Sequence, residues 1–217
     1  MKRPDVILLD LDGTLVDATE TIVEGILALA AESGLRVPQR EEARAFIGRP
    51  PLQSWASLGA EDPAALVDAF TARVMPRLAR DGVLLPGVGR AVPALRAAGH
   101  TLAVATTRMT GSARDSLEHV GLLASISQVS GRDLVPHPKP APDVLLHALE
   151  ALGRGPGAAL MVGDSTADVE AAHAAGMPCW AVLGGIEDRA ALRAAGADRI
   201  LDGGVGELPA ALGLAPS

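Results

Sequence analysis

The chain has 217 residues, of which 48% are hydrophobic and only 2% aromatic, and its formal net charge is −7. This length fits one large domain, or a domain that carries a smaller inserted one, and the apolar content is sufficient for a sizeable core. The negative charge argues against non-specific binding to nucleic acid, which needs a basic surface to displace counterions. An anionic substrate therefore has to be attracted by a local positive site, because the overall field repels it.

The sequence shows no feature of an exported or membrane-bound protein. No apolar run reaches the ~18 residues of a membrane span. The apolar run behind the basic N-terminus ends at Asp10, too soon for a signal peptide. The single cysteine, Cys179, excludes an internal disulfide and is consistent with a reducing compartment. We expect a cytoplasmic protein without a membrane or nucleic-acid partner; its oligomeric state is left open.

The first apolar run, residues 6–9, is typical of a strand buried on both faces, and it leads into two carboxylates, Asp10 and Asp12. In open α/β sheets, ligands bind at the carboxyl ends of the strands. Two carboxylates this close raise each other's pKa unless a cation lies between them. A metal would keep Asp10 ionised as a nucleophile while Asp12 transfers a proton. The alternative is an acidic strand end that is merely solvated.

Residues 18–81 have helical spacing throughout, with helices expected up to about residue 33 and over 41–47, 52–58 and 64–78. A run of helices inserted after the first strand of an α/β protein indicates a separate cap domain. We therefore expect a core domain of residues 1–17 and 82–217 and an all-helical cap of residues 18–81. Within the insert, Arg49 lies between a glycine and two prolines. It is a candidate contact to a second group of the substrate, or else an exposed arginine on a helix connection.

After residue 87, strand and helix patterns alternate with short connections. Strands are expected over 101–106, 126–129, 158–162, 177–183 and 199–201, and helices over 89–98, 111–120, 141–152, 166–175, 187–195 and 205–212. This alternation predicts an α/β fold with a doubly wound parallel sheet.

Polar residues end three of these strands, namely Asp10, Thr106 and Asp164. Because a parallel sheet places its carboxyl ends along one edge, these side chains meet if their strands are neighbours. Asp168 follows Asp164 by about one helical turn. Together with Asp10 this pair offers oxygen ligands, which suit Mg²⁺ better than zinc. The simpler interpretation of the Asp164–Asp168 pair is the cap of a helix.

Thr107 and Arg108 extend the polar group that ends the second long strand, and we consider both candidates for substrate binding. Lys139 is notable because only two of the 19 basic residues are lysines. A site that requires a compact point charge explains a lysine here. Its proline-rich setting, residues 136–142, is stiff. A chance lysine in a surface loop is the alternative.

The ordered segments LDLDGT, the strand-ending threonine, HPKPAPD and VGDSTAD resemble the four motifs of the haloacid dehalogenase-like hydrolase superfamily, in particular its phosphoglycolate phosphatase-like branch. The resemblance implies a Rossmann-like core and a helical cap that selects the substrate. It implies that Asp10 is the nucleophile, forming an aspartyl-phosphate, and that Asp12 is the general acid and base. Thr106 would bind the phosphoryl oxygens, and Lys139 would neutralise charge between nucleophile and phosphate.

The same resemblance implies a Mg²⁺ ion bound by the Asp10 carboxylate, the Asp12 main-chain carbonyl and Asp164, with Asp168 supporting it directly or through water. The expected function is a Mg²⁺-dependent phosphatase that hydrolyses a small phosphorylated metabolite.

Other activities of the superfamily fit the sequence less well. Haloacid dehalogenases usually lack the second aspartate, which is present here, and phosphonoacetaldehyde hydrolases use a cap lysine, which the insert lacks. β-Phosphoglucomutase-like enzymes usually have a histidine in the first cap segment, and residues 17–21 contain none. This absence weakens the interpretation as a phosphomutase, which remains an alternative. A non-hydrolytic phosphate-binding regulatory protein also remains an alternative.

Overall fold

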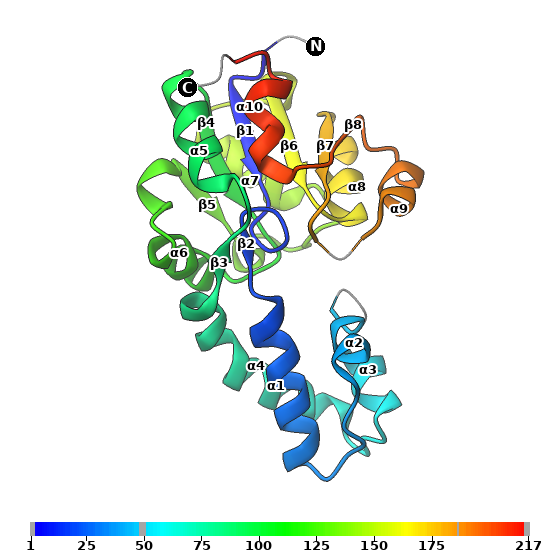
Figure 1. The fold of residues 1–217 in the computed structure, drawn as a ribbon. Coiled ribbons are helices and arrows are strands. Elements are labelled where there is room, and N and C mark those ends of the chain that lie inside the picture. Colours follow the sequence, from blue (N-terminus) through cyan, green and yellow to red (C-terminus); the bar gives the residue numbers. More distant parts are fainter. Residues whose placement is uncertain (1–2, 48–50, 186, 215–217) are drawn as a thin grey trace. The chain divides into compact units, whose positions relative to one another are not determined.

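The computed structural model describes residues 3–47, 51–185 and 187–214. Figure 1 shows the course of the chain through its helices and strands. The chain divides into two compact units. The larger unit comprises the chain up to Asp17 and the chain from Val83 onward, and the smaller unit is Ala18–Gly82.

The larger unit is built on a six-stranded sheet with the order β5-β4-β1-β6-β7-β8, in which every pair of neighbours is parallel. The strands are β1 (Val6–Leu9), β4 (Thr101–Ala105), β5 (Gln128–Ser130), β6 (Ala159–Gly163), β7 (Cys179–Val182) and β8 (Arg199–Leu201). The prediction of a doubly wound parallel sheet is therefore confirmed.

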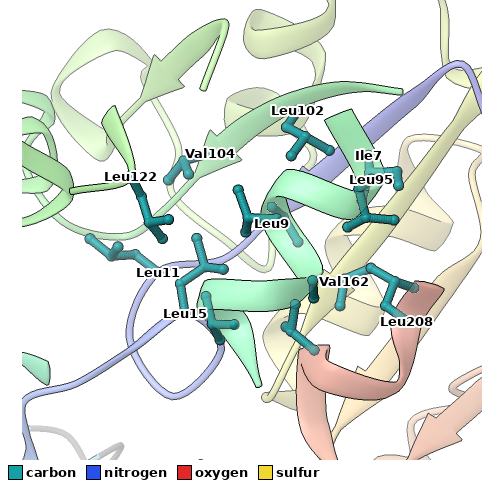
Figure 2. Close-up of a cluster of buried hydrophobic side chains, with 14 of the residues drawn as sticks. Ile7, Leu9, Leu11, Leu15, Leu95, Leu102, Val104, Leu122, Val162 and Leu208 are labelled. Atoms are coloured by element: carbon teal, nitrogen blue, oxygen red, sulfur yellow. The ribbon is translucent and has the colours of Figure 1, made fainter. Parts of the chain in front are cut away.

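Both faces of the sheet are buried, which explains why β1 is apolar at every position. Ile7 and Leu9 contribute to one hydrophobic cluster, and Val6 and Leu8 to another. The first cluster includes Leu95 of α5 and Leu208 of α10, whose side chains converge with those of β1 and β4 in Figure 2. The second cluster includes side chains of α7 and α8. The helices of this unit are α5 (Val88–Ala97), α6 (Thr110–His119), α7 (Asp143–Ala151), α8 (Thr166–Ala174), α9 (Arg189–Ala194) and α10 (Leu208–Ala211).

Some predicted elements differ from the structure. The helix expected over 205–212 is a 3₁₀ helix, Gly204–Glu207, followed by the short α10. Gly204 and Gly206 in the 3₁₀ helix and Pro209 in α10 disfavour a continuous α-helix. A two-residue antiparallel ribbon of β2 (Val16–Asp17) and β3 (Val83–Leu84) was not predicted, because two residues carry no periodicity.

The smaller unit consists of four described helices, α1 (Thr19–Glu32), α2 (Arg40–Arg44), α3 (Pro51–Ser57) and α4 (Pro63–Asp81). The helix expected over 41–47 ends at Arg44, and residues 45–47 form a turn. The start of α4 is fixed by the Asp62 side chain, which accepts a hydrogen bond of 3.1 Å from the Ala65 N–H. The unit has a hydrophobic cluster of its own that includes Ile26 and Trp55. No helix in the described part of the chain combines the length and the hydrophobicity that a membrane span requires.

The central strands are buried between the helices of the larger unit, and Leu102 in β4 is completely buried. We predict that Leu102→Ala lowers the free energy of unfolding by about 2–5 kcal/mol, because it removes buried methyl groups and leaves a cavity. The chain has two tryptophans, so a Trp55→Phe background leaves Trp180 in β7 as the fluorescent reporter of this unit during urea denaturation. Leu134, which is 43% exposed, provides the control Leu134→Ala. Equal losses for the two variants would contradict this packing.

Candidate active site

The three strands that end in the predicted polar residues are neighbours. β1 lies between β4 and β6, so Asp10, Thr106 and Asp164 are placed side by side at the carboxyl edge of the sheet. The Asp10 N–H donates to the Val162 carbonyl at 2.9 Å, which continues the β1–β6 pairing into the site. All three side chains are buried. The parallel sheet thus collects groups that are more than 150 residues apart in sequence.

Lys139 lies at the centre of this group. Its Nζ donates to Asp10 Oδ1 at 2.8 Å, to Asp168 Oδ1 at 2.5 Å and to the Ala105 carbonyl at 3.1 Å. An ammonium group has three donors, and all three are used here. The side chain is only 2% exposed, so its position is fixed by these contacts and not by solvent. A lysine that bridges two carboxylates places a single positive charge directly beside Asp10.

Asp168 is fully buried, and both of its carboxylate oxygens have partners. Oδ1 accepts from Lys139, while Oδ2 accepts from the Ser165 N–H at 3.1 Å and the Ser165 hydroxyl at 2.7 Å. Ser165 and Asp168 form the capping box of α8. The helix cap and the lysine contact are therefore made by the same carboxylate. Asp168 fixes the position of Lys139 relative to the start of α8.

Asp164 is held closely by its surroundings. The Thr14 hydroxyl donates to Asp164 Oδ1 at 3.1 Å. Two glycines leave room for the carboxylate: a Cβ on Gly13 would lie 2.2 Å from Asp164 Oδ2, and one on Gly185 would lie 1.6 Å from it. Gly13 also has φ = 75°, which side-chain-bearing residues rarely adopt. The turn after β1 therefore requires glycine for two reasons, its backbone angle and its approach to Asp164.

The site holds more negative than positive charge. Asp10, Asp164 and Asp168 each offer a carboxylate oxygen, and these oxygens lie within 4.8 Å of one another, whereas Lys139 supplies one ammonium. The pKa of Asp10 is raised to about 6. Burial raises it most and the carboxylate of Asp168 adds to the rise, while the ammonium of Lys139 opposes it. Burial and the neighbouring carboxylates Asp10 and Asp168 also raise the pKa of Asp164.

Lys139 responds in the opposite direction. Burial by itself lowers the pKa of its ammonium group, but the carboxylates of Asp10 and Asp168 outweigh burial and raise the pKa above its ordinary value. Lys139 therefore remains charged at neutral pH. A compact, permanently positive group beside Asp10 can neutralise an anion that approaches this carboxylate.

Asp12 lies apart from this buried group and is bound to Arg108. The guanidinium donates from Nε to Asp12 Oδ2 at 2.6 Å and from Nη2 to Oδ1 at 2.5 Å. Arg108 also donates from Nη1 to the Ser116 hydroxyl at 2.6 Å, and its own N–H donates to Thr106 Oγ1 at 3.2 Å. The sequence indicated Arg108 as a substrate contact, and the structure places it on the carboxylate of Asp12.

The remaining candidates are placed as follows. Thr106 is buried, and its hydroxyl accepts from the Arg108 N–H, while Thr107 is exposed. Arg49 falls outside the described residues. Ser116 was missed by sequence reasoning because nothing in a helix sequence marks the partner of a distant arginine. Gly185 was missed too, whereas the sequence offered Asp164 or Ser165 as the helix cap, and the structure shows that Ser165 is the cap.

Comparison with known proteins agrees with this geometry. Residues 7–182 match the family described as haloacid dehalogenase-like hydrolase. A protein of Dickeya dadantii named "Probable phosphatase IndB" is 35% identical, over 91% of this chain and 89% of its own length. A phosphoglycolate phosphatase of Mesorhizobium japonicum is 30% identical, over 87% of this chain and 86% of its own length.

Among solved structures, a haloacid dehalogenase family hydrolase of Deinococcus radiodurans with bound phosphate and sodium has a TM-score of 0.83. It is 26% identical, and the match covers 100% of both chains. The matched stretch of the chain includes the two aspartates that follow β1, and also Asp164 and Asp168, which follow β6. On this evidence the chain belongs to the haloacid dehalogenase-like hydrolase family.

Proposed function

We propose that this protein is a Mg²⁺-dependent phosphatase that hydrolyses a small phosphate monoester through an aspartyl-phosphate on Asp10. The observation that carries the proposal is the contact between Lys139 and Asp10, 2.8 Å long and almost completely buried. A carboxylate held beside a fixed ammonium at a ligand-binding sheet edge is suited to attack an anionic phosphorus centre. The phosphatase names of the Dickeya and Mesorhizobium relatives support the same reaction class.

The donor set of the site fits a hard divalent cation. Three buried carboxylates face one ammonium, so the group lacks positive charge. Burial, and to a smaller extent the neighbouring carboxylates, raise the pKa values of Asp10 and Asp164. All the available ligands are oxygen atoms, as Mg²⁺ prefers. We assign the ion to the carboxylates of Asp10 and Asp164 and the main-chain carbonyl of Asp12. Both oxygens of Asp168 have protein partners, so Asp168 supports the site through Lys139.

Each residue then has a distinct part in the reaction. Asp10 attacks phosphorus, and Lys139 neutralises charge on the phosphoryl oxygens as the bond to the leaving oxygen breaks. The Thr106 hydroxyl donates a hydrogen bond to the same oxygens. Asp12 delivers a proton to the leaving oxygen and later takes one from the water that hydrolyses the aspartyl-phosphate. When bound, Mg²⁺ supplies further positive charge for the transferring group.

Loss of the nucleophile is the most direct test of this assignment. Asp10→Asn should lower phosphate release from 2-phosphoglycolate or p-nitrophenyl phosphate by at least ~10³-fold, because an amide cannot form the aspartyl-phosphate. Chelation with EDTA should abolish wild-type activity, and added Mg²⁺ should restore it. The exposed carboxylate Asp68 provides the control Asp68→Asn, which should keep full activity. Retained activity in Asp10→Asn would contradict the proposed nucleophile, and unchanged activity in EDTA would contradict the metal requirement.

The charge balance of the site also predicts an effect on stability. Asp10 has an ordinary pKa of 3.8 and a pKa of about 6 in the folded protein. Between these values the folded state keeps a proton that the unfolded state has lost, so ionising Asp10 destabilises the fold as the pH rises. The loss is complete above about pH 6 and amounts to at most about 3 kcal/mol. In EDTA at pH 8, Asp10→Asn should therefore be more stable than the wild type by about 1–3 kcal/mol.

Urea denaturation in EDTA at pH 8 and pH 4 measures this difference. It should shrink at pH 4, where Asp10 is largely protonated in the folded state and much less so in the unfolded chain. The Asp68→Asn control should change stability by less than about 0.5 kcal/mol at either pH. A destabilised Asp10→Asn variant at pH 8 would show that the contact with Lys139 outweighs the excess of negative charge.

A further inference from the structure

The contact between Arg108 and Asp12 conflicts with the proton transfer assigned to Asp12. Both oxygens of this carboxylate accept charge-assisted hydrogen bonds from the guanidinium, at 2.5 and 2.6 Å. The guanidinium cannot deliver a proton in place of Asp12, because it stays protonated under all ordinary conditions. As long as the pair is intact, each oxygen of Asp12 accepts a bond from the guanidinium, and adding a proton to the carboxylate removes the negative charge on which both bonds depend.

The two partners differ in how firmly they are held. The Arg108 side chain is only 5% exposed, and two further hydrogen bonds, to Ser116 and Thr106, fix the residue in place. The Asp12 side chain is 40% exposed, and its two carboxylate oxygens accept from Nε and Nη2 of the guanidinium. Arg108 is therefore the fixed partner, and Asp12 is the partner that can leave. Its departure uncovers two N–H donors of a fork that matches carboxylate and phosphate oxygens.

We propose that Arg108 is a latch that holds Asp12 until a second anionic group of the substrate takes its place on the guanidinium. This inference rests on the proposed phosphatase function and adds a substrate class to it: phosphate monoesters whose leaving group carries a carboxylate or a second phosphate. Such a group exchanges with Asp12 on the same two donors. The exchange releases Asp12 at the moment when the substrate is bound, so binding and proton transfer are coupled.

A monoester without a second anionic group cannot make this exchange. Its phosphate can bind beside Lys139, but Asp12 remains on Arg108 for most of the time. The latch thus favours the anionic substrate in two ways. The second anionic group of this substrate gains a contact to Arg108, and the freed Asp12 becomes available for proton transfer. The latch also explains how an acidic protein selects an anionic leaving group, since Arg108 supplies a local positive charge separate from that of Lys139.

Two substrates of nearly equal shape separate these effects. 2-Phosphoglycolate has a carboxylate on its leaving group, and 2-hydroxyethyl phosphate has an uncharged hydroxymethyl group in its place. Arg108→Met removes the charge and keeps most of the side-chain length, and Arg108→Lys keeps a point charge without the fork. Arg114, exposed on α6, provides the control Arg114→Met. Steady-state kinetics give kcat and KM for each enzyme and each ester, and circular dichroism checks the fold of each variant.

The latch predicts opposite effects of Arg108→Met on the two esters. For 2-phosphoglycolate, kcat/KM should fall by about 100-fold, because the contact to its carboxylate is lost. For 2-hydroxyethyl phosphate, kcat should rise several-fold with little change in KM, because Asp12 is no longer held. Arg108→Lys should restore part of the preference for 2-phosphoglycolate, and Arg114→Met should leave both esters at wild-type values.

A parallel fall in kcat for both esters would overturn the latch, since it would show that Arg108 only positions Asp12 for catalysis. Unchanged kinetics for both esters, or a misfolded Arg108→Met together with a well-folded Arg108→Lys of wild-type selectivity, would also overturn it. These results leave the proposed phosphatase intact. Failure of the wild type to release phosphate from either ester or from p-nitrophenyl phosphate would instead contradict the proposed function, and the latch with it.

Discussion

Three buried carboxylates and a single ammonium group lie together at the carboxyl edge of the sheet. Most of the local contacts hold these four side chains in place. Burying a charged group costs much free energy unless hydrogen bonds or opposite charges replace its contacts with water. Lys139 therefore contacts both Asp10 and Asp168, the Ser165 hydroxyl and N–H complete the contacts of Asp168, and Thr14 donates to Asp164. The charge that remains uncompensated is the reason why we propose this group as a site for a cation and a phosphoryl group.

The parallel sheet is the means by which this group is assembled. Apart from Thr101 at the start of β4, its central strands β1, β4 and β6 have no polar side chain because both faces are covered. The polar residue that follows therefore marks the point where each strand leaves the core. This is why the parallel sheet and the positions of Asp10, Thr106 and Asp164 at strand ends were predictable from the sequence, whereas the sequence left open whether these strands are neighbours. The hydrophobic pattern places the strand ends, and the preference for short, right-handed crossovers places helices between them.

Other features depend on contacts that no local pattern encodes. The pairing of Asp12 with Arg108 joins residues 96 positions apart, and either residue alone is compatible with several partners. The sequence offered a helix cap and a metal-binding pair as alternatives for Asp168; the structure shows the cap and adds a contact with Lys139 that the sequence did not indicate. The β2–β3 ribbon and the 3₁₀ turn before α10 are too short for periodicity to reveal them.

In the proposed reaction, buried Asp10 beside Lys139 is the nucleophile, and the more exposed carboxylate of Asp12 on Arg108 transfers the proton. The central claim is that Asp10 carries the phosphoryl group, and trapping that intermediate tests the claim most directly. Asp12→Asn should slow hydrolysis of the intermediate, so this variant is mixed with Mg²⁺ and p-nitrophenyl phosphate, whose leaving group departs without a proton from Asp12. The mixture is then quenched in acid and analysed by peptide mass spectrometry. We predict one phosphoryl group on Asp10. A phosphoryl group on another residue, or unmodified Asp10 while the wild type turns over the same ester, would contradict the account.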